Sequence, residues 1–146
     1  MSAVLRTSVP QAPSPRPVPS GEPADRWTWR TPAGRALSAA VGVAALGSGF
    51  ALGGAVGLPF WAALVAPDLV FLRKADPPAT GPGRLPPGTV GPYNTLHDPR
   101  LAAALLAAGV LTASRPLLLA GLGWTAHIAV DRACGFGLRR PDGAIH

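Results

Sequence analysis

Charged residues are missing from two long stretches of the chain, and this pattern decides which elements we expect. No charge occurs between Arg35 and Asp68, and none occurs between Arg100 and Arg115. A soluble four-helix bundle would need polar helix faces, which these stretches do not provide. Uncharged apolar runs of this kind are typical of membrane-spanning helices.

The first run, residues 36–67, is too long for a single span. As one helix it would extend roughly 48 Å at 1.5 Å per residue, whereas the hydrocarbon core of a bilayer is about 30 Å thick. Gly53 and Gly54 provide a break near its middle. The pattern therefore predicts a helical hairpin with helices at about 36–52 and 56–73.

Three glycines of this hairpin have a second interpretation. Their GxxxG spacing is typical of helices that pack closely in membranes (Gly49, Gly53 and Gly57). Two of them fall in or beside the predicted turn, so the turn is the favoured interpretation.

The second half of the chain predicts another pair of helices, at about 92–113 and 116–136. Pro92 can open the first of these as a residue of its first turn, and Pro99 is expected to bend it near its start. The expected fold class is therefore all-α, a bundle of four transmembrane helices.

Two segments rich in proline separate and precede these helices. Residues 74–91 are expected to be a loop, and residues 1–34 a disordered tail, because repeated prolines prevent a helix and few residues there could form a core. The predicted organisation is a disordered cytoplasmic tail at 1–34 and a four-helix integral membrane domain at 35–143.

The placement of basic residues predicts the topology. The chain has thirteen Lys and Arg against seven Asp and Glu, a net charge of +6. The basic residues gather in the tail, the middle loop and the C-terminal segment, whereas the hairpin tips carry only Arg115. The positive-inside rule then places both termini and the long loop in the cytoplasm, in the cell (inner) membrane. The expected partner is the lipid bilayer; nucleic acid is not expected, and a homo-oligomer is left open.

Ionisable side chains inside membrane segments are costly and need a reason. Asp68 lies in the second predicted helix directly after Pro67, which has no N–H and so leaves the carbonyl of Ala63 without its helical partner. His127 and Asp131 lie in the fourth helix at i and i+4, one turn apart on the same face.

His97 begins the third predicted helix, with Tyr93 and Asn94 four and three residues before it on the same side. In the fourth helix Trp124 lies three residues before His127, where core packing is its expected role. Arg132 is expected to mark the cytoplasmic end of that helix, although it could also bind a phosphate-bearing lipid headgroup.

The predicted topology brings the ionisable groups to a similar depth. Counted from the outer helix ends, Asp68 and His127 lie roughly 17–21 Å down at 1.5 Å per residue. His97 and Asp131 lie near the same cytoplasmic side, so the four side chains can converge.

Two His and two Asp are suitable ligands for a divalent metal such as Zn, Mn or Fe, which could activate water for hydrolysis. The alternative is a structural cluster, for example a His127–Asp131 pair and an Asp68–Arg132 pair that hold the helices together. A CxxC zinc site and an intramolecular disulfide are excluded, because Cys134 is the single cysteine.

Three segments together resemble a known family: Ala66–Leu69, Tyr93–His97 and Gly123–Arg139. They are similar to the motifs PDLS, YNxxH and WxxHIxxDRxxGYGLK of the small bacterial membrane proteins grouped as domain of unknown function 4260. The resemblance covers about residues 35–143. It implies a multi-pass membrane protein and assigns no activity.

The chain departs from this family in three places. Phe136 stands where the family usually has Tyr, Arg139 stands where it usually has Lys, and the Glu that often begins the first helix is missing. A looser similarity, in the PD…H…HxxxD arrangement, is to membrane-bound metal-dependent hydrolases. Two hypotheses follow: a membrane protein with a metal-dependent hydrolytic site at the cytoplasmic end of the bundle, or a non-catalytic membrane scaffold or interaction protein. The sequence does not decide whether the protein is an enzyme.

Overall fold

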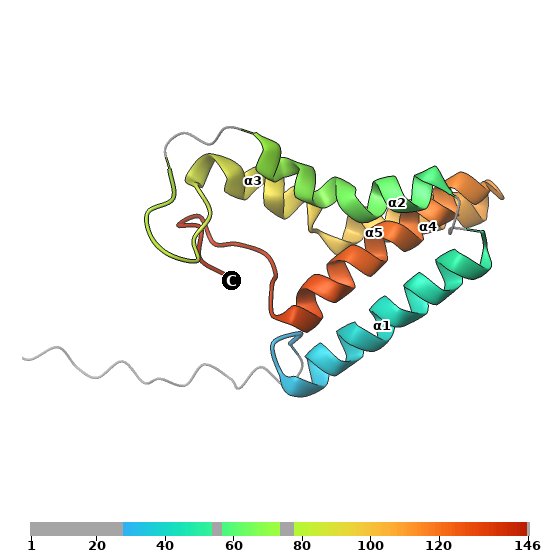
Figure 1. Ribbon diagram of the computed structural model, residues 1–146, viewed down its shortest axis with the longest axis horizontal. Coiled ribbons are helices and arrows are strands. Elements are labelled where there is room, and N and C mark those ends of the chain that lie inside the picture. Colours follow the sequence, from blue (N-terminus) through green and yellow to red (C-terminus); the bar gives the residue numbers. More distant parts are fainter. Residues whose placement is uncertain (1–27, 54–56, 74–77, 146) are drawn as a thin grey trace, which may run out of the picture.

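The computed structural model describes residues 28–53, 57–73 and 78–145, and this part of the chain is helical, without strands (Figure 1). The elements are, in order, α1 (Pro32–Ala51), α2 (Leu58–Val65), the 3-10 helix η2 (Ala66–Leu72), α3 (Pro87–Leu96), α4 (Pro99–Leu111) and α5 (Arg115–Cys134). The expected all-α class is confirmed.

The helix α5 is the centre of the bundle. α1, α2 and α4 each pack mainly on α5, while α3 packs on η2; Figure 1 shows α5 between α1 and α2. Two glycines of α5 allow this close approach. A Cβ at Gly123 would overlap the backbone carbonyl of Phe60 in α2, and a Cβ at Gly121 would lie 2.8 Å from the backbone nitrogen of Leu106 in α4. Small residues thus let helix backbones meet on two sides of α5.

The first helix begins four residues before the predicted Ala36. Thr31 caps it, since its Oγ1 accepts a hydrogen bond from the Gly34 N–H at 3.0 Å, and Pro32 is tolerated in a first turn. The prediction of a disordered tail therefore does not hold for residues 32–34. Residues 1–27, on which most of that prediction falls, lie outside the described residues.

The glycines of the first hairpin divide between the two interpretations. α1 ends at Ala51, and Gly53 adopts a φ of +82°, a left-handed conformation that suits a turn. Gly57 is the N-cap residue of α2. Gly49 lies against the ring of Phe60, where a Cβ would overlap that ring, so this glycine is a packing site.

The second predicted helix, 56–73, is less regular than expected. α2 is an α-helix only to Val65, and the chain continues as the 3-10 helix η2 to Leu72. Pro67 lies in the first turn of η2. Because it has no N–H for an α-helical hydrogen bond, it favours the change from α-helix to 3-10 helix at this point.

The prediction of one helix at 92–113 is wrong. The chain forms α3 and α4, separated at His97 and Asp98. Because Pro99 disfavours the helical conformation for the residue before it, Asp98 is extended, with φ −74° and ψ 122°. The Asp98 side chain then caps α4 by accepting a hydrogen bond from the Arg100 N–H at 2.9 Å.

The predicted loop at 74–91 is shorter than expected, because a proline again begins a helix. α3 begins at Pro87, which occupies the first turn, and Pro92 lies inside the helix instead of opening it. Residues 74–77 of this loop lie outside the described residues.

The fourth predicted helix, 116–136, corresponds to α5. Gly135 ends it with a φ of +97°, as a C-terminal glycine typically does. The chain then folds back, forming an isolated bridge between Arg139 and Ile145, and Arg84 pairs with Asp142 to hold this segment against the loop before α3.

By length and composition, α1 is the helix of the described part that could cross a membrane. The helical segment Leu58–Leu72 is apolar but shorter. Four membrane spans therefore stay a prediction.

Candidate functional site

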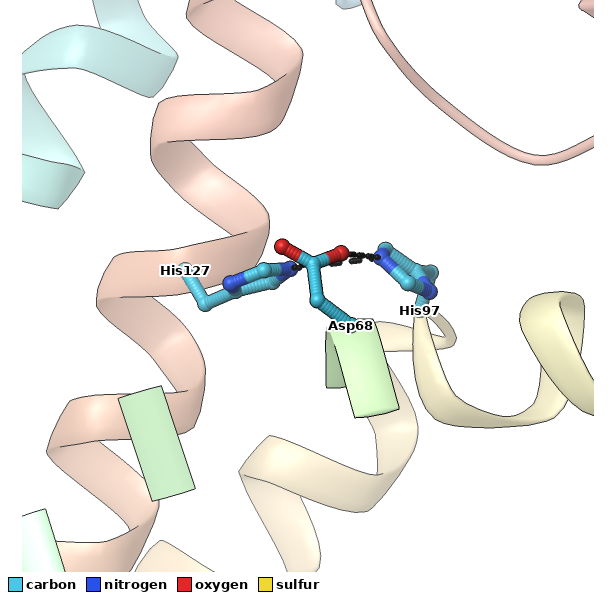
Figure 2. Close-up of side chains that lie close together, drawn as sticks. All are labelled: Asp68, His97 and His127. Carbon is cyan, nitrogen blue, oxygen red and sulfur yellow. Dashed lines mark hydrogen bonds and ion pairs between the residues drawn. The ribbon is translucent and has the colours of Figure 1, made fainter. Parts of the chain in front are cut away.

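Two histidine side chains from different helices meet at the centre of the candidate site. The Nε2 atoms of His97, at the end of α3, and His127, in α5, lie 3.2 Å apart, and both residues are buried. Figure 2 shows the carboxylate of Asp68, from η2, between the two imidazole rings. The structure thus brings together side chains that are 59 residues apart in the chain, from Asp68 to His127.

The Nδ1 atom of each ring is held by a backbone carbonyl. His127 Nδ1 lies 2.9 Å from the carbonyl oxygen of Leu64, and His97 Nδ1 lies 2.9 Å from that of Tyr93. A carbonyl oxygen only accepts hydrogen bonds, so both Nδ1 atoms carry hydrogen. In the neutral rings, both Nε2 atoms therefore present lone pairs, and these face each other.

The carbonyl of Leu64 is available because of Pro67. In an α-helix the carbonyl of Leu64 would accept a hydrogen bond from the N–H of Asp68. Asp68 lies in η2, where the i to i+3 pattern directs its N–H to Val65 instead, and Pro67 beside it has no N–H to donate. The 3-10 geometry of η2 thus leaves an acceptor that fixes the orientation of His127.

His97 is positioned by the end of α3. It is the C-cap residue, directly before the break that Pro99 imposes on the helix. Its ring stacks on that of Tyr93, one turn earlier, with centroids 3.8 Å apart and planes 17° apart. With only 3% of its side chain exposed, His97 has little freedom to turn away from the cluster.

Two carboxylates complete the cluster. Asp131 Oδ2 lies 3.4 Å from His97 Nε2 and 3.6 Å from His127 Nε2, while Asp68 Oδ1 lies 3.7 Å from each. The Asp68 side chain is 53% exposed and that of Asp131 is 24% exposed. The cluster is therefore open to solvent on the side of Asp68 and buried on the side of the histidines.

The spacing of these atoms suits a shared divalent ion. Ligand atoms that lie about 2.0–2.2 Å from one tetrahedral ion are roughly 3.3–3.6 Å from each other. The distances from imidazole nitrogen to nitrogen and to carboxylate oxygen range from 3.2 to 3.7 Å. Asp68, His97 and His127 by themselves form a group that could hold a metal ion.

The predicted supporting residues have different roles. Trp124 Nε1 donates to the carbonyl of Leu96 at 2.8 Å and so fixes the end of α3 beside His97. The Asn94 side chain both donates to and accepts from the backbone of Arg139, which ties the C-terminal segment to α3.

Arg132 lies apart from the cluster. It lines a cavity between α1, α4 and α5, and within the described ranges no ion pair joins it to Asp68. The structural alternative predicted two pairs. His127 and Asp131 lie close together as it predicted, but within the described residues Asp68 and Arg132 form no ion pair.

The backbone carbonyls that orient the two imidazole rings are not evident from the sequence. Pro67 leaves the carbonyl of Ala63 without its α-helical donor, as the sequence predicts. The carbonyl that orients His127 is the next one, that of Leu64, and the sequence does not single it out. Arg139 was also missed: its guanidinium lies over the ring of Tyr93, 5.6 Å from the centroid, on the residue that supports His97.

Comparison with known proteins identifies the family. The family model described as domain of unknown function 4260 matches residues 38–146. The chain belongs to this family. The predicted resemblance is confirmed, and the matched region of this family member contains all four residues of the cluster. No curated protein and no solved structure matches the chain.

Proposed function

We propose that this member of the domain of unknown function 4260 family is an integral membrane protein with a divalent metal centre held by His97, His127, Asp68 and Asp131, which serves a hydrolytic reaction. One observation carries the proposal: both histidines donate their Nδ1–H to a backbone carbonyl and direct Nε2 at the same point. Metal-binding histidines are typically oriented in this way.

The charge of the cluster favours a cation at this point. Two lone pairs 3.2 Å apart repel each other unless a positive charge lies between them. With neutral histidines the two carboxylates bring a charge of −2, which a divalent ion would neutralise. A proton shared between the Nε2 atoms would relieve the repulsion but would neutralise only half of this charge.

A resident divalent ion would supply one kind of chemistry, which is to lower the pKa of a bound water toward neutrality. The protein would supply the rest. The buried histidines hold a fixed geometry, and Asp68, the most exposed member, is the carboxylate that an arriving substrate would meet and that could accept a proton.

The exterior of the bundle supports a location in the membrane. Large apolar side chains are exposed along several helices, more than a soluble protein usually tolerates: Leu37, Val43, Leu58, Leu72, Val110 and Leu111. The α2–η2 segment would extend roughly 26 Å, and α1 and α5 about 30 Å each. α4 is shorter, at roughly 20 Å, because of the break before it.

The proposed topology places the clustered basic residues and the His/Asp cluster on the cytoplasmic side. Single cysteines at Thr80, in the long loop, and at Thr112, near the opposite hairpin tip, test it in a Cys134→Ala background. Thr80→Cys should react with an impermeant thiol reagent only after the cells are opened, and Thr112→Cys should react in intact spheroplasts. The reverse pattern would overturn the topology.

Metal content tests the site directly. The protein purified in detergent should contain about one divalent ion per chain, measured by mass spectrometry of the elements. His127→Ala and Asp68→Asn should reduce this content, by about tenfold or more for the histidine. Asp142→Asn, which removes an exposed carboxylate in the C-terminal segment, is the matched control and should keep the ion.

The alternative, a non-catalytic scaffold, predicts a different result for the same variants. A structural cluster would contain no metal above background, and His127→Ala would disturb helix packing, seen as a lower thermal midpoint by circular dichroism. Absence of metal in the wild type after purification without chelator and after reconstitution with Zn²⁺, Mn²⁺ and Fe²⁺ would refute the metal centre.

A further inference from the structure

A second candidate site lies on the face of α5 that turns away from the His/Asp cluster. It is a cavity of about 350 Å³ between α1, α4 and α5. This volume is within the range of about 300–1,000 Å³ that ligand pockets usually have. The cavity exists because α1 and α4 both pack mainly on α5 and leave space between themselves.

The wall of this cavity is apolar over most of its length. Side chains from all three helices contribute to it, including Leu37, Val41, Ala103, Leu106 and Ile128. Thr125 and Arg132 mark its extent along α5, which is about 10 Å at 1.5 Å per residue. This shape suits a hydrocarbon chain lying parallel to the helices.

One end of the cavity is positively charged. Arg132 is the charged side chain among the described residues that line it, and it is half-buried. Arg35 lies beside this end, because its Nε donates to the carbonyl of Ala133 at 2.8 Å. Asp98, an acid whose charge acts on Arg132, already accepts a hydrogen bond from the N-terminus of α4. This end therefore favours an anionic group.

We propose that the cavity binds an anionic phospholipid, with one acyl chain between α1 and α4 and the phosphate at Arg132. A guanidinium pairs well with phosphate oxygens. The charged end lies at the start of α1 and the end of α5, where the proposed topology puts the cytoplasmic headgroup layer. The inference rests on the proposed membrane location and is independent of the metal centre.

Native mass spectrometry of the detergent-solubilised full chain tests this site. The probes are phosphatidylglycerol and phosphatidylcholine with the same acyl chains, and glycerol 3-phosphate as a headgroup without chains. The wild type should bind phosphatidylglycerol at least about tenfold more tightly than phosphatidylcholine, as expected for a charge-assisted hydrogen bond in a half-buried site. Glycerol 3-phosphate should bind weakly, because it lacks the apolar contacts.

Two variants separate charge from shape. Arg132→Gln should remove the preference for phosphatidylglycerol, and Arg140→Gln, which removes an exposed arginine away from the cavity, should keep it. Ala103→Phe should weaken binding of both lipids, because this exposed residue lines the cavity and a larger side chain would fill it. Circular dichroism and metal content of each variant should match the wild type.

The proposal is overturned if Arg132→Gln retains the wild-type preference, if Ala103→Phe binds both lipids as the wild type does, or if glycerol 3-phosphate binds as tightly as the lipid. Loss of the lipid preference in Arg132→Gln with unchanged metal content would support the lipid site and leave the metal centre unaffected. Loss of metal in His127→Ala with unchanged lipid preference would support the metal centre and leave the lipid site unaffected.

Discussion

Replacing Gly123 by Ala tests whether the close approach of α5 and α2 holds the cluster in place. The added Cβ would overlap the carbonyl of Phe60 and lie 3.1 Å from the backbone nitrogen of Leu64. Both neighbours are backbone atoms, so no side chain can turn aside and α2 must move as a unit. The carbonyl that orients His127 belongs to the same Leu64, and we therefore expect loss of both stability and metal.

The size of the effect follows from two opposing terms. Ala is favoured over Gly in a helix interior by about 1 kcal/mol. Overpacking costs about 1–3 kcal/mol, and backbone contact places this site at the upper end of that range. The free energy of unfolding should therefore fall by about 2 kcal/mol.

Gly47 provides the matched control. It lies inside α1, and nothing would lie within 4 Å of an added Cβ. Gly47→Ala should therefore raise the free energy of unfolding by up to about 1 kcal/mol, through helix propensity alone. Both values are measured by reversible denaturation in mixed micelles. A Gly123→Ala variant as stable as Gly47→Ala would show that α5 and α2 do not pack this closely.

Three further predictions concern the ends of the bundle. Arg115→Gln should lower the free energy of unfolding by about 1 kcal/mol in the same assay, because the guanidinium donates two hydrogen bonds to the Leu52 carbonyl at the C-terminus of α1; an unchanged value would contradict this role. The hydrogen bond from Arg84 holds the pKa of Asp142 in the folded protein below its ordinary value of 3.8. The Arg84–Asp142 pair therefore stabilises the C-terminal segment fully above pH 3.8, and this stabilisation is lost as the pH falls through the pKa of the folded protein. Hydrogen-exchange protection of this segment, corrected for intrinsic rates, should fall over that range in the wild type, and a flat profile matching that of Asp142→Asn would contradict the prediction. A chain beginning at Arg26 should insert into membranes and unfold like the full chain, because the spacing of the prolines before it predicts no packed element. A large loss of stability would show that these residues pack on the bundle.

The convergence of the ionisable groups could be predicted because it depends on short-range rules. Helical periodicity places His127 and Asp131 on one face, and the alternation of uncharged runs and basic loops places Asp68 and His97 at the same end of the bundle. The structure brings these side chains together. Occupancy by a metal stays a prediction.

The orientation of the rings could not be predicted because it depends on a contact between distant segments. His127 meets the carbonyl of Leu64 across 63 residues, and only packing of α5 on α2 creates this contact. Pro67 did signal a free carbonyl. Pro67 points to the carbonyl of Ala63, whereas the carbonyl that meets His127 is that of Leu64, which the change from α-helical to 3-10 geometry leaves without its α-helical donor.

The break between α3 and α4, in contrast, was visible in the sequence. Asp98 followed by Pro99 is a typical helix start, with an N-cap residue before a proline in the first turn. Treating Pro99 as a bend within one helix gave more weight to the apolar pattern than to this local signal. The break matters for the site, since it places His97 at a helix end.

The central position of α5 has a consequence for how the protein is made. α5 (Arg115–Cys134) follows in the sequence every helix that packs on it, so α1, α2 and α4 leave the ribosome before their common partner exists. Until α5 is made, these earlier helices have little to hold them together, and His97 and Asp68 have no second imidazole beside them. Assembly of the bundle and completion of the cluster are therefore one late event in biosynthesis, and a chain that stalls before residue 115 would carry neither.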